Sequence, residues 1–78
     1  MGMTLEELAR GQIARVIGFR SEDSGLEPKL REIGFAEDDE VEIVHFGPLM
    51  ARPVCVRLNR TLIALRRNEA AAIEVSIG

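Results

Sequence analysis

Two apolar runs and the turn-rich segment between them constrain the fold of this chain more than any other feature of its sequence. The runs are residues 41–46 and 54–58, and residues 47–53 separate them. Alternating runs rich in β-branched residues are typical of half-buried strands, whereas two prolines and a glycine between such runs indicate a loop. The sequence therefore predicts a long β-hairpin whose loop is formed by residues 47–53.

Three more segments are predicted as strands, which brings the expected number to five. They are residues 12–19, 61–65 and 73–77. The first is apolar on both faces, which suits a curled sheet, and the last alternates apolar and polar residues. Asn59 and Arg60 separate the hairpin from the next strand, and they predict a tight turn in which Asn59 takes a positive φ.

One helix is expected at residues 26–33. Leu26, Leu30 and Ile33 have the i, i+4, i+7 spacing of a single apolar stripe. Pro28 is tolerated only in the first turn of a helix, and Gly34 suits the position that ends one. Shorter helical turns are expected at residues 4–8, where Thr and Glu have the capping-box spacing, and at residues 66–71.

These elements define a fold class that is mainly β with one short helix. The 78 residues make one domain, residues 1–78, and short strands joined by tight turns predict a small five-stranded barrel. A barrel of this size is filled by its own side chains, and the sequence contains no nucleophile–histidine set and no phosphate-binding loop. We therefore do not expect an enzyme.

Candidate metal ligands are few. The chain has one His and one Cys, His45 and Cys55, and strand alternation predicts that His45 points inward with Ile43 while Cys55 points outward. A β-bulge would bring the two together, but two ligands are too few for a site. The acidic run 37–40 lacks the spacing of a calcium loop and is expected to be a solvated turn. We expect no resident cofactor and no binding of Fe(II) or another divalent metal by this chain alone.

The sequence indicates a cytoplasmic protein. A single Cys excludes an intramolecular disulfide and suits a reducing compartment. No secretory signal pattern and no apolar run long enough for a transmembrane helix is present. The apolar fraction of 46% is high for so small a core, so some apolar side chains, with Val44 and Phe46 as candidates, are expected on the surface. A homo-oligomer is one arrangement that would cover them.

Charge is distributed unevenly along the chain. Residues 1–42 carry five Lys or Arg and eleven Asp or Glu, whereas residues 43–78 carry five Arg and two Glu. No acidic residue lies between Ile43 and Asn68. Two interpretations stay open: an ordinary scatter of surface charge, or a basic stripe that binds an acidic partner through bidentate arginine contacts.

Six short motifs follow one another along the chain. They are Thr4-Leu5-x-x-Leu8-x-x-Gly11, Ala14-x-Val16, Lys29-Leu30-x-x-Ile33-Gly34-Phe35, Val41-Glu42-Ile43-Val44, Gly47-Pro48-Leu49 and Ala64-Leu65-Arg66-Arg67-x-Glu69-Ala70-x-x-Ile73-x-Val75. In this order and spacing they resemble the FeoA family, small cytosolic partners of the bacterial ferrous iron transporter FeoB. The resemblance implies an SH3-like barrel and a non-catalytic accessory role in ferrous iron uptake, through binding of the cytosolic region of FeoB. It implies contact with the membrane only through the transporter.

The hairpin loop departs from the family pattern. Family members usually carry Gly-Asp-Pro after Pro-Leu, whereas Met50-Ala51-Arg52-Pro53 follows here. Two alternatives to the main interpretation are an SH3-like module that binds nucleic acid and a stand-alone relative of the C-terminal domain of metal-dependent repressors. A net charge of −3 and only three aromatic residues are unlike a nucleic-acid-binding surface, so no nucleic acid is expected.

We expect the partner to be bound by the hairpin loop and the arginines of the basic half. The candidate residues are Pro48, Leu49, Met50, Arg52, Arg57, Arg60, Arg66 and Arg67. An apolar loop beside an acid-free arginine stripe can attract a partner by charge and then bury apolar surface. The alternative for Arg66 and Arg67 is ordinary surface charge on a helical turn, paired with Glu69 or Glu74.

Overall fold

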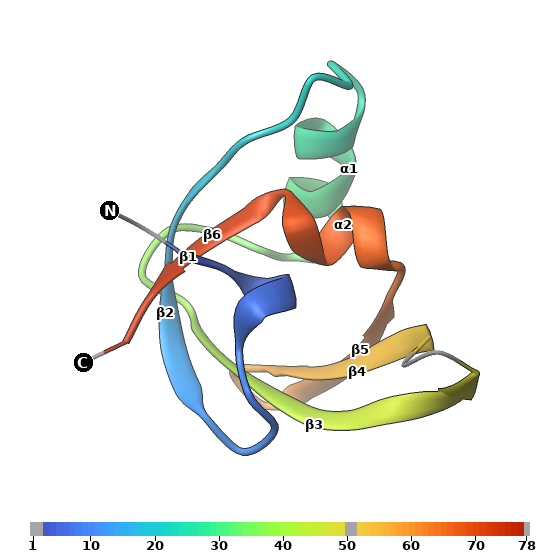
Figure 1. Ribbon diagram of the computed structural model, residues 1–78. Helices are drawn as coiled ribbons and strands as arrows, with labels where there is room; N and C mark the ends of the chain where they lie inside the picture. The colour runs from blue at the N-terminus through green and yellow to red at the C-terminus, as the bar shows by residue number, and fades with distance from the viewer. Residues whose placement is uncertain (1–2, 50–51, 78) are drawn as a thin grey trace.

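The computed structural model describes residues 3–49 and 52–77, without the side chains of Pro48, Leu49 and Arg52. The elements in chain order are β1 (Met3–Thr4), the 3₁₀ helix η1 (Leu5–Glu7), β2 (Ile13–Phe19), α1 (Leu26–Ile33), β3 (Glu40–Leu49), β4 (Arg52–Leu58), β5 (Thr61–Leu65), α2 (Arg67–Ala71) and β6 (Ile73–Ser76). Figure 1 shows both α-helices at one end of a curled sheet. The predicted fold class, mainly β with one short helix, is confirmed.

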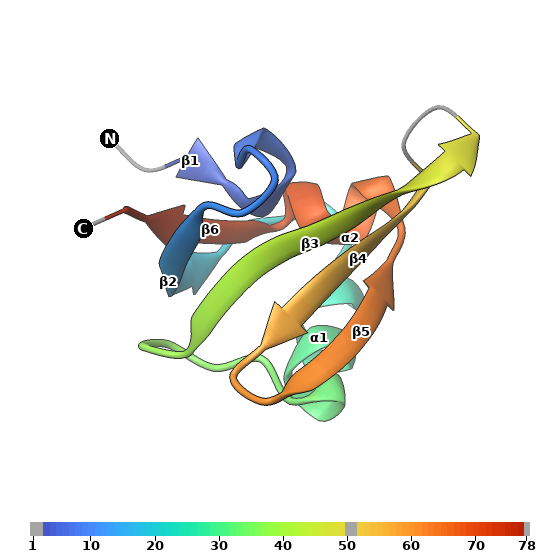
Figure 2. The same cartoon turned by 90° about the horizontal axis from the view of Figure 1, so that it is seen from below.

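The strands form one antiparallel sheet in the order β1-β6-β2-β3-β4-β5. Figure 2 shows β5 at one margin of this sheet and β1 at the other. The described sheet has six strands rather than the five expected, because Met3 and Thr4 pair with Val75 and Glu74 of β6. A strand of two residues is too short to show the alternation by which strands are predicted.

The β3–β4 hairpin is longer than predicted and its loop is shorter. Pairing of the two strands continues as far as Leu49 and Arg52, so most of the expected loop belongs to the strands. The register shifts between Phe46 and Leu49, and a proline in such an irregular stretch removes no regular ladder bond. Pro48 is therefore compatible with a strand, although its residue type indicated a turn.

A bulge in β3 changes the face on which its side chains lie. The register shifts between Ile43 and His45, which places His45 directly opposite Cys55. Val44 and His45 are both exposed, while Phe46 packs against the core. The predicted alternation holds for Val44 and is wrong from His45 onward, because the extra residue of a bulge reverses the parity of those that follow. His45 points outward and Phe46 inward.

Apolar side chains from the sheet and the helices fill the interior. The buried ones are Leu5, Leu8, Ala14, Val16, Leu26, Leu30, Phe35, Val41, Ile43, Val54, Val56, Leu58, Leu65, Ala70, Ala72, Ile73 and Val75. Gly34, with a φ of +131°, ends α1, and the amide of Phe35 then donates to the carbonyl of Leu30 at 3.1 Å. This turn directs Phe35 into the core. Ile33, which was expected to belong to the buried apolar stripe of the helix, is 40% exposed. Among the described residues, no helix has the length and apolar content needed to span a bilayer.

Candidate partner-binding site

The eight residues predicted to bind a partner lie in different parts of the fold. Pro48 and Leu49 end β3, Arg52 begins β4, and Met50 lies outside the described residues. The other four candidates are arginines, and they lie on β4, in the β4–β5 turn and at the start of α2. Only these four have side chains whose surroundings can be compared with the predicted basic stripe.

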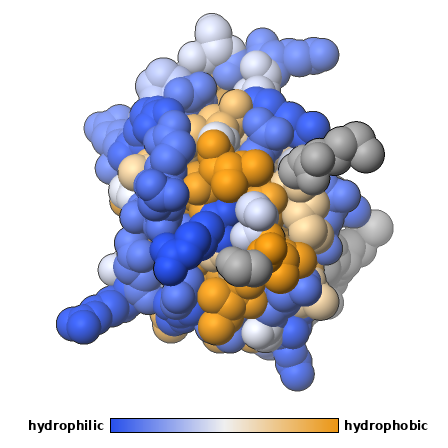
Figure 3. All heavy atoms as spheres, turned by 90° about the vertical axis from the view of Figure 1, so that its left-hand side faces the viewer, coloured by the Kyte–Doolittle hydropathy of each residue, from blue (hydrophilic) through white to orange (hydrophobic). Residues whose placement is uncertain are grey.

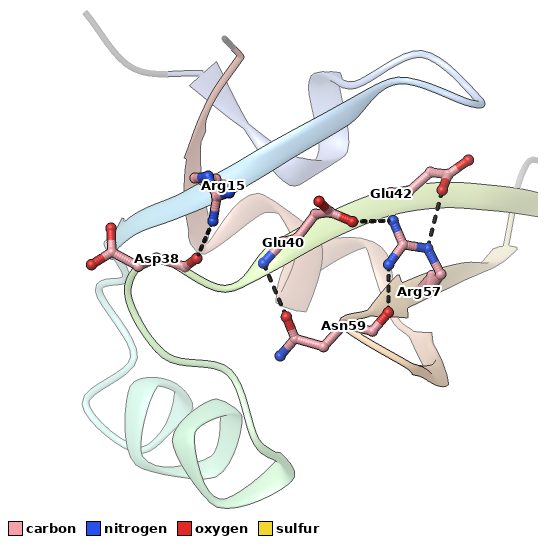
Figure 4. A network of polar contacts seen from close by, with 6 residues as sticks. All are labelled: Arg15, Asp38, Glu40, Glu42, Arg57 and Asn59. Carbon is pink, nitrogen blue, oxygen red and sulfur yellow. Dashed lines mark hydrogen bonds and ion pairs between the residues drawn. The ribbon is translucent and has the colours of Figure 1, made fainter.

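Arg57 is not part of a free basic surface, because two glutamates of β3 neutralise it (Figure 4). Its Nη2 lies 2.8 Å from Glu40 Oε2, and its Nε lies 3.1 Å from Glu42 Oε1. Hydrogen bonds to Glu40 and then Glu42 raise the pKa of the Arg57 guanidinium above its ordinary value. The segment that lacks acids in the sequence is therefore not acid-free in space, and the predicted stripe is wrong at this position.

Asn59 fixes the turn that carries Arg60. Its φ is +53°, which confirms the predicted turn conformation. Its backbone N–H donates to the carbonyl of Glu40 at 2.9 Å. Its Oδ1 accepts the backbone N–H of Glu40 at 3.2 Å (Figure 4). Arg15 of β2 holds the turn just before β3, since its Nη1 donates to the Asp38 carbonyl at 2.9 Å (Figure 4). Arg60 is thus exposed at the tip of a turn with a defined backbone.

Arg66 and Arg67 have different surroundings. Arg67 Nε lies 2.6 Å from Glu6 Oε1, which joins α2 to η1, so the predicted partners Glu69 and Glu74 are wrong for this residue. Arg66 is exposed. Within residues 3–49 and 52–77, neither its side chain nor that of Arg60 has an ion-pair partner.

Glu69 is a buried charged residue that sequence reasoning did not include in the site. It is 6% exposed, its Oε1 accepts the Arg66 amide at 2.7 Å, and its Oε2 lies 2.8 Å from Lys29 Nζ. Burial raises the pKa of the Glu69 carboxyl, but the Lys29 ammonium and the Arg66 amide outweigh burial and hold the pKa below its ordinary value. The contact joins α2 to α1. The spacing of Arg66 and Glu69, that of a helix-capping glutamate, was the available signal.

His45 and Cys55 lie opposite each other on the outer face of the sheet, which corrects the predicted separation of the two side chains. In the part of the chain that the structure describes, no group of three or more His, Cys, Asp or Glu side chains is placed to hold a metal ion. The absence of metal binding by this chain alone stays a prediction.

Several large aliphatic side chains are exposed. They are Ile13, Ile17, Ile33, Val44, Leu62 and Ile77. Figure 3 shows hydrophobic residues interrupted by hydrophilic ones on the side of the molecule where β1, β2 and β6 lie. The expected exposure of Val44 is confirmed, whereas the homo-oligomer stays a prediction. Leu62, on the marginal strand β5, is the most exposed of the group at 62%.

Comparison with known proteins gives a consistent result. The model of the family described as the FeoA domain matches residues 3–77. The iron(II) transport protein A of Clostridium thermocellum is 35% identical to the chain, with a TM-score of 0.83. The match covers 96% of this chain and 45% of that protein, so the chain spans less than half the length of this relative. A search of curated proteins found no match.

A second solved relative identifies the class of fold. FeoA of Stenotrophomonas maltophilia, solved as a complex with zinc and described as a prokaryotic SH3 domain protein, is 34% identical with a TM-score of 0.81. That match covers 95% of this chain and 89% of the relative. The predicted SH3-like fold is therefore confirmed.

A manganese-dependent transcriptional repressor shares the fold alone. It is 18% identical, with a TM-score of 0.85 over 99% of this chain and 42% of the repressor. The family model, by contrast, covers almost the whole chain, and two iron transport relatives exceed 30% identity. The chain therefore belongs to the FeoA family, which is linked to ferrous iron transport.

Proposed function

We propose that this chain is a non-catalytic accessory protein of ferrous iron uptake, which works in the cytoplasm by binding the cytosolic region of the transporter FeoB. The observation that carries the proposal is membership of the FeoA family over residues 3–77. Two solved relatives support it, one described as an iron(II) transport protein and the other as a candidate activating factor of bacterial ferrous iron transport.

The proposed contact surface combines the tip of the β3–β4 hairpin with the two arginines that have no ion-pair partner among the described residues. Arg60 and Arg66 lie just before and just after β5, and both are exposed. Arg57 and Arg67 are already paired with carboxylates of this chain, so we expect them to contribute less to partner binding than Arg60 and Arg66. Exposed arginines attract an acidic partner at long range and bind its carboxylates in bidentate geometry.

The test is a calorimetric titration of the purified cytosolic domain of FeoB with this protein. Charge reversal at Arg66 and Arg67 should weaken binding by about tenfold or more, and binding of the unchanged protein should weaken as salt rises. Because Arg67→Glu also faces Glu6, the single variant Arg66→Glu shows whether the loss comes from the surface or from the fold. The matched control Arg10→Glu, which changes an exposed arginine before β2, should bind like the unchanged protein.

Two results would contradict the proposal at different levels. No binding of the transporter domain by the unchanged protein would overturn the function. Undiminished binding by Arg66→Glu would overturn the contact surface alone. Tight, salt-sensitive binding of mixed RNA in place of the transporter domain would favour the nucleic-acid alternative.

A further inference from the structure

The strand β5 is a sheet edge without the features that usually protect one. It ends the sheet, and its one partner strand there is β4 (Figure 2). Among the described residues, no backbone group of 61–65 bonds to any element other than β4. Its sequence, TLIAL, has no proline and no charge, and its pairing with β4 shows no register shift. Proteins blunt exposed edges with proline, charge, bulges or very short strands, so β5 is open to pairing with another extended chain.

The opposite edge, β1, is protected. It has two residues, and the amide of Thr4 already donates to Glu7 Oε1 at 2.7 Å. A short strand whose donor is engaged by its own chain offers little to a partner. The contrast makes β5 the accessible edge of this sheet.

The register of the β4–β5 pair shows which backbone groups of β5 are free. Leu58 and Thr61 pair across the turn at 59–60, and the closing pair of such a hairpin is hydrogen-bonded. Because hydrogen-bonded and non-hydrogen-bonded pairs alternate, Leu62 and Ala64 direct their N–H and C=O groups toward the free margin. Both side chains are exposed. The free edge thus combines backbone donors and acceptors with exposed apolar surface.

The charges that flank β5 disfavour a second copy of this chain as the occupant. Two copies paired antiparallel about Ile63 would place Leu62 opposite Ala64 of the second copy. The same register would place Arg60 opposite Arg66 of the second copy, and like charges directly opposite each other are destabilising. An acidic residue at each end of the added strand would instead pair with both arginines.

We propose that β5 binds an extended segment of another protein as an additional antiparallel strand, apolar in its centre and acidic at both ends. Small Ala64 leaves room for a large apolar side chain opposite it, and a second apolar side chain would cover Leu62. Main-chain hydrogen bonds supply affinity in this mode, and charges at Arg60 and Arg66 set the register. The inference deepens the proposed function, on which it rests for the identity of the natural partner, by naming the kind of segment that the partner presents.

The probe is the synthetic peptide Glu-Thr-Phe-Thr-Val-Thr-Glu with blocked ends, titrated into ¹⁵N-labelled protein and followed by NMR. In the proposed register its Phe lies opposite Ala64 and its Val opposite Leu62. We expect the amide signals of Leu62 and Ala64 to shift, and their hydrogen exchange to slow by about tenfold or more at saturation. Absence of binding, or shifts that leave these two amides unchanged, would overturn the inference.

Backbone methylation of the peptide separates strand pairing from simple charge attraction. N-methyl groups on Phe and Val remove the N–H groups that face β5 and should weaken binding by about tenfold or more. An N-methyl group on the central Thr, whose N–H points away, should leave most of the affinity. Equal binding of the two methylated peptides would show that no strand forms.

The flanking charges have their own matched test. A Lys-flanked peptide should bind the unchanged protein about tenfold more weakly. The variant with Arg60→Glu and Arg66→Glu should reverse that preference. An unaltered preference in this variant would remove Arg60 and Arg66 from the proposal and overturn the acidic chemistry of the segment.

The variant Ala64→Pro tests the edge from the side of the protein. A proline there removes an N–H that faces the free margin and no bond to β4, so peptide binding should be lost while the fold is kept. If the variant does not fold, the methylated peptides still decide the question on the unchanged protein. Binding of the FeoB domain that Ala64→Pro leaves intact would overturn this inference and leave the proposed function standing. If the peptide binds but the FeoB domain does not, the proposed function is overturned and this inference stands.

Discussion

Replacing Glu69 tests whether one buried carboxylate holds the two α-helices together. Its oxygens lie 2.7 Å from the Arg66 amide and 2.8 Å from Lys29 Nζ. Glu69→Ala removes both acceptors and leaves the amide that precedes α2 without a partner, so we expect the free energy of unfolding to fall by about 2 kcal/mol. Lys29 contributes the smaller share, because its side chain is 56% exposed. In a domain of this size the loss lowers Tm by roughly 10 °C.

The variant Glu69→Gln separates the hydrogen bond from the charge. Gln keeps an acceptor for the Arg66 amide but offers no charge to Lys29, and we expect a loss of about 1 kcal/mol. The folded-state pKa of Glu69 is below its ordinary value of 4.5. The ionised carboxylate therefore stabilises the folded protein above that pH, and this stabilisation is lost as the pH falls through the lower folded-state pKa. The difference between the unchanged protein and Glu69→Gln should be full at neutral pH and should disappear in strong acid.

Urea unfolding followed by circular dichroism measures these differences across the pH range. The matched control is Glu32→Gln, which removes an exposed charge from α1 that has no ion pair among the described residues, and it should change the free energy of unfolding by less than about 0.5 kcal/mol. Equal losses for Glu69→Gln and Glu32→Gln would refute the reasoning. A difference between the unchanged protein and Glu69→Gln that stays constant into strong acid would refute it as well.

Three further predictions use the same protein. Arg57→Ala, which breaks contacts with two carboxylates, should lower the free energy of unfolding by about 1 kcal/mol. Arg60→Ala should change it by less than about 0.5 kcal/mol. Equal losses in urea unfolding would contradict the different roles of the two arginines. Gly34→Ala should cost about 1–2 kcal/mol in the same measurement, since a φ of +131° strains any side chain; an unchanged midpoint would contradict this. Hydrogen bonds from Arg31, with a smaller contribution from a backbone hydrogen bond at Glu37, lower the pKa of Glu37 to about 2. NMR titration of Arg31→Ala should find this pKa raised toward 4.5. A pKa still near 2 would rule out the pairing with Arg31.

Most of the secondary structure was predictable because it depends on local patterns. The helix over Leu26–Ile33, its end at Gly34 and the turn at Asn59 follow from apolar spacing and from the conformations that Gly and Asn tolerate. The bulge after Ile43 was not predictable in this way, since an extra residue leaves no mark in a run of alternating residues. That single insertion reverses the faces of His45 and Phe46.

The candidate site was predictable only in part, because charge along a sequence says little about charge in space. The acid-free stretch that contains Arg57 pairs with a neighbouring strand that carries Glu40 and Glu42, so the sheet register neutralises it. Arg67 forms an ion pair with Glu6, which lies near the opposite end of the sequence. Such pairings join residues far apart in sequence, and they depend on which strands become neighbours.

By itself, the sequence determined the class of fold, the family and the positions of most helices and strands, since these follow from residue type, spacing and short motifs. Only the tertiary structure decided which arginines keep their charge available and which sheet edge stays open. The first depends on carboxylates that strand pairing brings together, and the second on the order of strands in the sheet. Both are properties of contacts between distant segments, and both concern the surface where we expect a partner to bind.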